Sequence, residues 1–159
     1  ATKRVLAIFP AEADYMQRKG AEVRWVGHPL IDRMQTALDR NAARTALGLS
    51  PDQLVITLLP ASRQQEIKYL LPIICQAAQQ IQQKLPQVQF LIPLALEKYR
   101  QSIDQAIEQY GLQARVLADQ VGTQANDPAQ SVTLQAIAAA DLAITKSGTV
   151  NLEVALLKT

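Results

Sequence analysis

Residues 54–71, LVITLLPASRQQEIKYLL, decide the fold. The run 54–59 is almost wholly apolar, as expected for a strand buried on both faces of a parallel sheet. From residue 66 to residue 84, apolar side chains recur at helical spacing and form one stripe, with Pro72 predicting a kink or a restart. A buried strand that leads directly into an amphipathic helix is the repeating unit of parallel α/β proteins.

The same alternation extends to both sides of this stretch. Further strands are predicted at 5–9, 22–26, 89–94, 114–117 and 141–145, and further helices at 12–19, 30–47, 97–110 and 149–157. Ser131 is predicted to cap one more helix, which runs through Leu134, Ile137 and Ala138. The prediction is an α/β fold with a Rossmann-like parallel sheet flanked by helices and right-handed crossovers. Its first strand has no earlier partner and its last helix no following strand, so we expect a fragment of a longer polypeptide, truncated at both ends.

Composition excludes several functional classes. The 159 residues are 48% hydrophobic and 19% charged, with a net charge of +2 and 4% aromatics. This argues against disorder, binding of nucleic acid through bulk charge, and base stacking. No apolar run reaches the roughly 18 residues of a membrane span. The lone Cys75 is interpreted as a buried side chain in a helix, and without a Cys/His cluster no zinc site is expected.

Ligands of parallel α/β sheets bind beyond the carboxyl ends of the strands, which selects two loops. In the first, Ala61 and Ser62 permit close approach to the backbone, and Arg63 offers a planar donor fork suited to phosphate. Glu66 either orients Arg63 or favours the helix N-terminus. The alternative is an ordinary turn with a solvated arginine.

In the second loop, Ser147, Gly148 and Thr149 open a helix, where free N–H groups and the helix dipole attract an anion. Gly148 would let a phosphate approach, although Thr149 is also a good N-cap without any ligand. Glu153 would accept from ribose hydroxyls or simply complement the dipole. Lys146 would add phosphate charge or point to solvent.

Other nucleotide motifs are missing, and one histidine remains to be explained. Neither the P-loop nor the Gly-x-Gly-x-x-Gly pattern is present. His28 lies between Gly27 and Pro29 at the predicted junction of two domains. It would face an interdomain cleft or, as we favour, serve the local structure of the turn.

Four stretches together resemble the lipid-A-disaccharide synthase family of GT-B-type glycosyltransferases. They are residues 7–12, the Gly-His-Pro connection within 26–32, the Leu-Leu-Pro-x-Ser-Arg loop within 58–67, and the Ser-Gly-Thr motif within 147–153. The sequence departs from the family's pattern at three positions: Ala61 for a usual Gly, Val150 for a common Ala, and Lys146 for a small residue.

The resemblance implies that residues 1–31 are the tail of an N-terminal acceptor-side domain with its connection, and that residues 32–159 are an incomplete nucleotide-sugar-binding domain, the C-terminal half of a GT-B fold. It implies UDP binding by Ser62, Arg63, Ser147, Gly148, Thr149 and Glu153, with Glu66, Lys146, Asn151 and His28 as further candidates. The general base is expected outside this chain. No metal or other cofactor is implied.

The implied reaction is inverting transfer of 2,3-diacylglucosamine from its UDP derivative to 2,3-diacylglucosamine 1-phosphate, with UDP released. The fragment alone is expected to be inactive. The implied partners are the UDP-sugar donor and the acylated glucosamine phosphate acceptor, without nucleic acid. The implied location is the cytoplasm, with peripheral association of the full-length enzyme at the inner membrane.

Two alternatives stay open. One is another UDP-sugar enzyme on this fold, an N-acetylglucosamine transferase or an epimerase. The other is a non-catalytic nucleotide-binding or interaction module.

Overall fold

The computed structural model describes residues 4–60, 63–94, 96–119 and 127–159. The chain forms two compact units, Ala1–Gln35 and Thr36–Thr159. They are called the N-terminal unit and the C-terminal unit below, and each is described by itself.

The N-terminal unit is a small parallel βαβ element followed by a short helix. Strands β1 (Val5–Ala7) and β2 (Val23–Trp25) pair in parallel, and α1 (Pro10–Arg18) connects them. The last helix of this unit is α2 (Pro29–Met34), which begins where the Nδ1 atom of His28 accepts a hydrogen bond of 3.1 Å from the Leu30 amide. The centroid of the His28 ring also lies 5.6 Å from the centroid of the Phe9 ring. His28 therefore has the structural role in the turn that the sequence analysis favoured.

The prediction of a single helix over residues 30–47 is wrong. The chain forms α2 and then α3 (Arg40–Ala46), separated by residues 35–39. The Asp39 carboxylate accepts a hydrogen bond of 2.8 Å from the Ala42 amide and begins a new helix, with Asp39 itself in an extended conformation. An aspartate that caps a helix in this way competes with continuation of the preceding one.

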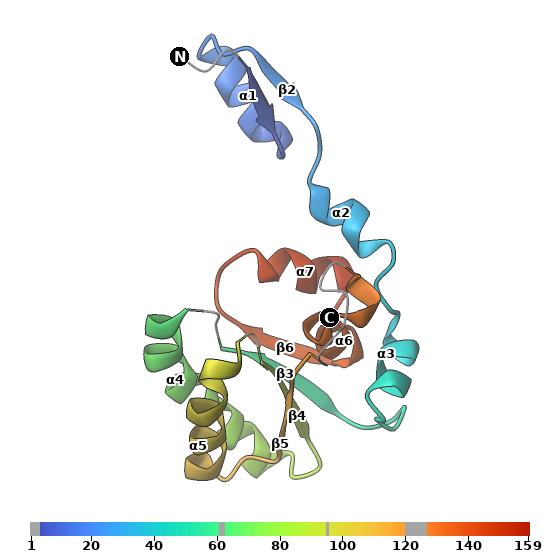
Figure 1. The fold of residues 1–159 in the computed structure, drawn as a ribbon, viewed down its shortest axis with the longest axis vertical. Coiled ribbons are helices and arrows are strands. Elements are labelled where there is room, and N and C mark those ends of the chain that lie inside the picture. Colours follow the sequence, from blue (N-terminus) through green and yellow to red (C-terminus); the bar gives the residue numbers. More distant parts are fainter. Residues whose placement is uncertain (1–3, 61–62, 95, 120–126) are drawn as a thin grey trace. The chain divides into compact units, whose positions relative to one another are not determined.

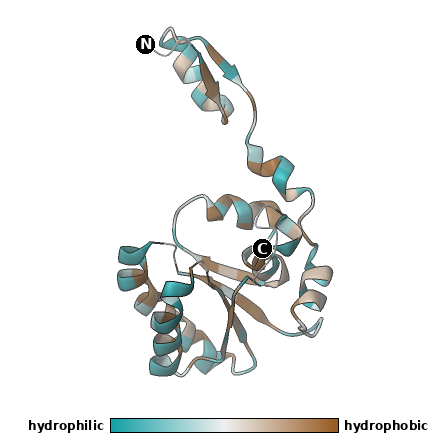
Figure 2. Ribbon diagram, in the orientation of Figure 1, coloured by the Kyte–Doolittle hydropathy of each residue, from teal (hydrophilic) through white to brown (hydrophobic). Residues whose placement is uncertain are grey.

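The C-terminal unit is built on a four-stranded parallel sheet (Figure 1). Its strands are β3 (Val55–Leu59), β4 (Gln89–Pro93), β5 (Ala114–Leu117) and β6 (Leu142–Thr145), in the order β5-β4-β3-β6. Every residue of β3 is buried, and hydrophobic residues follow the strands of this sheet (Figure 2). These observations confirm the predicted α/β fold with a parallel sheet.

Helices cover both faces of this sheet. One face packs against α4 (Gln64–Lys84) and α5 (Arg100–Tyr110), the latter preceded by a 3-10 turn at Glu97–Tyr99. The other face packs against α6 (Val132–Ala139), which follows a 3-10 turn at Pro128–Gln130 and contacts α3 and α7 (Val150–Leu157). The Thr57 hydroxyl donates to the Ala136 carbonyl at 2.6 Å and ties α6 to the central strand.

A kink or a restart was predicted at Pro72, and the restart is wrong because α4 continues through this residue. Proline removes one backbone hydrogen bond from a helix. The turns on both sides of Pro72 are held against the sheet by buried side chains of α4, namely Ile67, Leu71, Ile74, Cys75 and Ala78. Cys75 is fully buried, as predicted, and burial raises the pKa of its thiol to about 11.

The strand order reverses between β3 and β6. From β3 the chain moves outward through β4 to β5, and it then returns to place β6 on the opposite side of β3. The loops that follow β3 and β6 therefore lead to helices on different faces of the sheet. A crevice opens at such a reversal, outside the carboxyl ends of the strands.

The opposite end of the sheet is held by a buried arginine. The Arg44 side chain is 2% exposed and donates to the carbonyls of Ala139 at 2.9 Å, Ser50 at 3.1 Å and Pro51. It also donates to the Asp141 carboxylate at 2.9 Å. Asp141 accepts from the Val55 amide at 2.8 Å and pairs with the more exposed Arg40. This network joins α3 to the starts of β3 and β6.

The Asp141 carboxylate makes the folded chain less stable as the pH falls into the acid range. Burial by itself raises the pKa of Asp141, but the Val55 amide and the Arg40 and Arg44 guanidinium groups together bring it below its usual range. A carboxyl whose pKa is lowered on folding stabilises the fold above its unfolded pKa of about 3.9, and this contribution is lost as the pH falls through the folded pKa. We expect Asp141→Asn to be less stable than wild type at pH 6 in urea unfolding, and the difference to shrink toward pH 3. A difference that is independent of pH would contradict this role.

Candidate functional site

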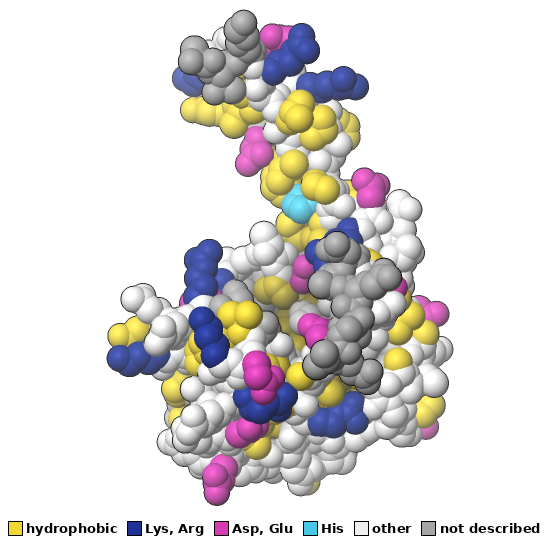
Figure 3. Space-filling view, in the orientation of Figure 1, with side chains coloured by type: hydrophobic (Ala, Val, Ile, Leu, Met, Phe, Trp, Pro, Cys, Tyr) yellow, Lys and Arg dark blue, Asp and Glu magenta, His cyan; other side chains and the backbone are white. Residues whose placement is uncertain are grey.

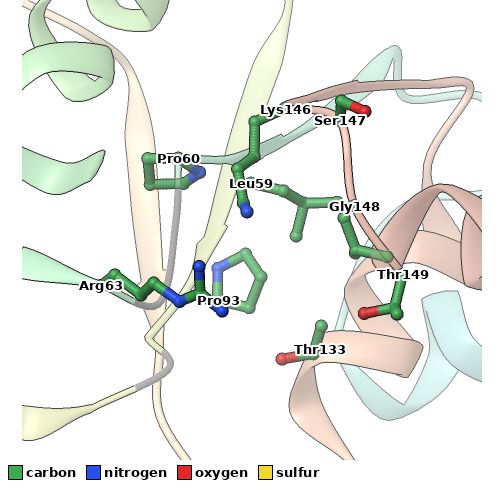
Figure 4. A pocket seen from close by; sticks show the side chains of 10 residues that line it. Leu59, Pro60, Arg63, Pro93, Thr133, Lys146, Ser147, Gly148 and Thr149 are labelled. Carbon is green, nitrogen blue, oxygen red and sulfur yellow. The ribbon is translucent and has the colours of Figure 1, made fainter. Parts of the chain in front are cut away.

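A cavity of about 500 Å³ opens at the reversal of strand order. Leu59, Pro60 and Arg63 line it after β3, and Pro93 lines it at the end of β4. The loop after β6 supplies the remaining wall together with Thr133 of α6, through Lys146, Ser147, Gly148, Thr149 and Val150. The two loops selected from the sequence thus meet in one cavity (Figure 4).

The polar groups in this cavity are donors. In Figure 4 the Arg63 guanidinium and the Lys146 ammonium extend toward the same space, which the hydroxyls of Thr149 and Thr133 also face. The Ser147 hydroxyl points away from that space. Two cations and two hydroxyls around one hollow suit an anion with several oxygens, such as a diphosphate.

The beginning of α7 adds backbone donors. Thr149 is its N-cap residue, but with helical φ and ψ of −60° and −28° its side chain caps no amide. The amides of Asn151 and Leu152 are already bonded to the carbonyls of Gly148 and Thr149. Within the part of the chain that the structure describes, the amides of Gly148, Thr149 and Val150 have no acceptor. Unpaired N–H groups at a helix N-terminus attract negative charge.

The backbone conformation at residue 148 does not require a glycine, because φ of Gly148 is not positive. A Cβ atom there would lie 3.4 Å from the Lys146 Nζ atom, the flexible end of a side chain. The ammonium of Lys146 is therefore packed close to the Gly148 backbone.

Glu66 joins the two loops. Its Oε1 atom lies 2.8 Å from Nζ of Lys146 and 4.0 Å from NH1 of Arg63. The hydrogen bond from Lys146, together with the charges of Lys146 and Arg63, lowers the pKa of Glu66 against the opposing effect of burial. Glu66 is therefore ionised at neutral pH, and Lys146 does not simply point to solvent.

The remaining sequence candidates lie elsewhere. Glu153 and Asn151 belong to α7 but do not line the cavity, and His28 belongs to the N-terminal unit. Ser62 is outside the described residues. Five of the predicted residues line the cavity, which are Arg63, Lys146, Ser147, Gly148 and Thr149.

Sequence reasoning missed Thr133 and Pro93. Thr133 follows Ser131, whose hydroxyl caps α6 at the Leu134 amide as predicted, and Pro93 ends the strand next to β3. Only their positions in the sequence could have pointed to these two residues. Both residues lie next to the end of an element that the sequence predicts, but only the strand order β4-β3-β6 shows that these ends share a rim.

Two further observations describe the chain beyond the cavity. On the face shown in Figure 3, the Lys and Arg side chains of the described residues lie in separate groups. Among residues 4–60, 63–94, 96–119 and 127–159, no helix has the length and hydrophobicity needed to cross a bilayer.

The comparisons with known proteins agree with one another. The family model for lipid-A-disaccharide synthetase matches residues 1–159. The lipid-A-disaccharide synthase of Gloeothece citriformis is 58% identical over 156 residues, which are 98% of this chain and 38% of that protein. The protein of the same name from Synechocystis is 52% identical over 157 residues, 98% of this chain and 37% of that protein.

A more distant relative, the lipid-A-disaccharide synthase of Geobacter sulfurreducens, is 36% identical over 154 residues, 97% of this chain and 37% of its own length. The chain thus spans well under half the length of the relatives that it matches. The match of the family model over all residues and these identities lead to one conclusion: the chain belongs to the lipid-A-disaccharide synthase family.

Proposed function

We propose that this chain is the UDP-sugar-binding part of an inverting glycosyltransferase of lipid A biosynthesis. The longer protein would transfer 2,3-diacylglucosamine from its UDP derivative to 2,3-diacylglucosamine 1-phosphate and release UDP. The observation that carries this proposal is the cavity at the reversal of strand order, where Arg63, Lys146 and the unpaired amides of residues 148–150 converge.

The role of these donors follows from the charge that develops in the reaction. An acceptor hydroxyl attacks the anomeric carbon, the bond from that carbon to the diphosphate oxygen breaks, and the hydroxyl proton passes to a general base. Negative charge then accumulates on the leaving UDP. Arg63 and the amides of Gly148 and Thr149 would stabilise this charge, because donors fixed beforehand need no reorganisation as the charge appears.

The other assignments come from family membership. Glu153 would accept from the ribose hydroxyls, Ser62 and Ser147 would offer hydroxyls, and Asn151 and His28 are further candidates. The base would belong to residues of the longer protein that this chain does not include. Because both sugars carry acyl chains, the longer protein would work in the cytoplasm at the surface of the inner membrane.

Calorimetric titration of the 159-residue chain with UDP and with uridine tests the binding part of this proposal. The diphosphate is the group that the cavity would recognise, so we expect UDP to bind at least about tenfold more tightly than uridine, since each charge-assisted hydrogen bond contributes about 1.5 to 3 kcal/mol. Equal affinities, or no binding of UDP, would favour a non-catalytic module.

The choice of donor separates this enzyme from other UDP-sugar enzymes on the same fold. The longer protein is incubated with 2,3-diacylglucosamine 1-phosphate and either the UDP-diacylglucosamine donor or UDP-N-acetylglucosamine. We expect a disaccharide 1-phosphate from the acylated donor only. Transfer from UDP-N-acetylglucosamine, or its epimerisation, would instead support one of the alternatives.

A further inference from the structure

One carboxylate oxygen, that of Glu66, lies near two cations, one of which is 80 residues away in the sequence. Glu66 Oε1 lies 2.8 Å from Lys146 Nζ and 4.0 Å from Arg63 NH1. The side chains of Glu66 and Lys146 are 20% and 27% exposed, whereas that of Arg63 is 81% exposed. The pair of Glu66 with Lys146 is therefore a partly buried ion pair between the first turn of α4 and the loop after β6, and Arg63 is the exposed member of the group.

The position of Lys146 is electrostatically unfavourable by itself. Its ammonium lies beside Gly148, at the beginning of α7, where the unpaired amides of residues 148–150 already present positive partial charge. A cation near a helix N-terminus is repelled by the helix dipole. The Glu66 carboxylate, in the first turn of α4, compensates for this repulsion.

The hydrogen bonding of the Glu66 carboxylate is only partly satisfied. Its second oxygen, Oε2, is buried and has no hydrogen-bond partner among the residues that the structure describes. An unsatisfied buried carboxylate oxygen lowers stability. What favours an anion is the charge of the group as a whole, because the two cations Arg63 and Lys146 outnumber the one carboxylate and lie near the unpaired amides of residues 148–150.

Lys146 retains donors for such an anion. An ammonium has three N–H groups, and one of them faces Glu66 Oε1. The other two remain for oxygens in the cavity, so an anion can be bound without breaking the tie to Glu66.

We propose that Lys146 is a second cation for the diphosphate of the nucleotide-sugar, and that Glu66 is the positioning residue that holds it at the beginning of α7. This inference rests on the proposed function, because the same cavity must bind a nucleoside diphosphate. It gives a role to Lys146, which stands where the family's pattern has a small residue.

Calorimetric titration of UDP into the 159-residue chain tests Lys146 directly. We expect Lys146→Ala to weaken UDP binding about tenfold, the size of one charge-assisted hydrogen bond, and Lys146→Arg to recover most of that loss. The matched control is Lys68→Ala, which removes the same charge from an exposed lysine of α4 that does not line the cavity, and it should change the affinity by less than about twofold.

A double-mutant cycle tests the positioning role of Glu66. The substitution E66Q is made in wild type and in the K146A variant, and the loss of UDP affinity that it causes is measured in each. We expect this loss to be at least about threefold larger in wild type, because K146A leaves no ammonium to position. A purely structural role for Glu66 predicts the same effect in both backgrounds, and that result would overturn its assignment as a positioning residue. Unfolding curves in urea confirm that each variant is folded.

Arg63→Ala distinguishes failure of this inference from failure of the proposed function. If Arg63→Ala weakens UDP binding while Lys146→Ala binds UDP like wild type, the diphosphate site stands and the inference about Lys146 is wrong. If UDP does not bind to wild type, or if neither substitution changes its affinity, the proposed function fails and the inference fails with it.

Discussion

Replacing Arg63 by alanine should weaken UDP binding about 30-fold in calorimetric titration. Arg63 reaches the cavity from the loop after β3 with a side chain that is 81% exposed, and its NH1 atom lies 4.0 Å from the Glu66 carboxylate. Its five N–H donors are therefore largely available to a diphosphate, which a guanidinium binds through two parallel hydrogen bonds. Hydrogen bonds to charged groups contribute about 1.5 to 3 kcal/mol, equivalent to roughly 10- to 100-fold in affinity.

Two variants define the specificity of this effect. Arg63→Lys keeps the charge but loses the planar fork, so we expect an intermediate affinity. Arg100→Ala removes an arginine of α5 that pairs with Glu97 and lies outside the cavity, and it should leave the UDP affinity within about twofold of wild type. Equal affinity of the Arg63→Ala and Arg100→Ala variants would show that Arg63 contributes only through net charge.

The second large effect concerns stability. Arg44→Met should lower the free energy of unfolding in urea by about 3 kcal/mol, the lower end of the range for breaking a buried ion pair. Methionine fills similar space but cannot donate to the carbonyls of Ala139, Ser50 and Pro51 or to Asp141. Asp141 would keep its pair with Arg40 and its bond from the Val55 amide, which places the effect at the lower end.

Arg40→Ala is the matched control for Arg44→Met. It removes the other arginine that pairs with Asp141, but the Arg40 side chain is 50% exposed, so its loss should change the unfolding free energy by less than about 1 kcal/mol. If the two variants were equally stable, the buried position of Arg44 would not be what stabilises the junction of α3 with the sheet.

Local patterns in the sequence were enough to predict the sheet and the two loops. Buried parallel strands such as 55–59 are recognisable because every side chain along them is apolar or small. The helix that follows, α4, is recognisable because its apolar side chains recur at helical spacing. The Ser-Gly-Thr turn was recognisable because small and hydroxyl residues there separate a strand from a helix. The rule for ligand position in parallel sheets then selected the same rim for both loops.

Two kinds of feature could not be predicted, namely a local helix cap hidden by the apolar pattern and contacts between residues far apart in the sequence. The break between α2 and α3 follows from a cap at Asp39 that the apolar periodicity of 30–47 conceals. The role of Arg44 depends on Ala139 and Asp141, about 95 residues away, and Lys146 finds Glu66 across 80 residues. Periodicity reports which face of an element is apolar, but it carries no information on which polar groups meet across the fold.

The central claim is that the loops after β3 and β6 bind one diphosphate together, and an NMR titration of the 159-residue chain with UDP tests it most directly. We predict that the Arg63 side-chain Nε–H signal and the backbone amide signals of Gly148 and Thr149 shift along curves that give one common Kd. The claim is contradicted if the Arg63 signal shifts while both amide signals stay in place, or if the two loops respond with different Kd values.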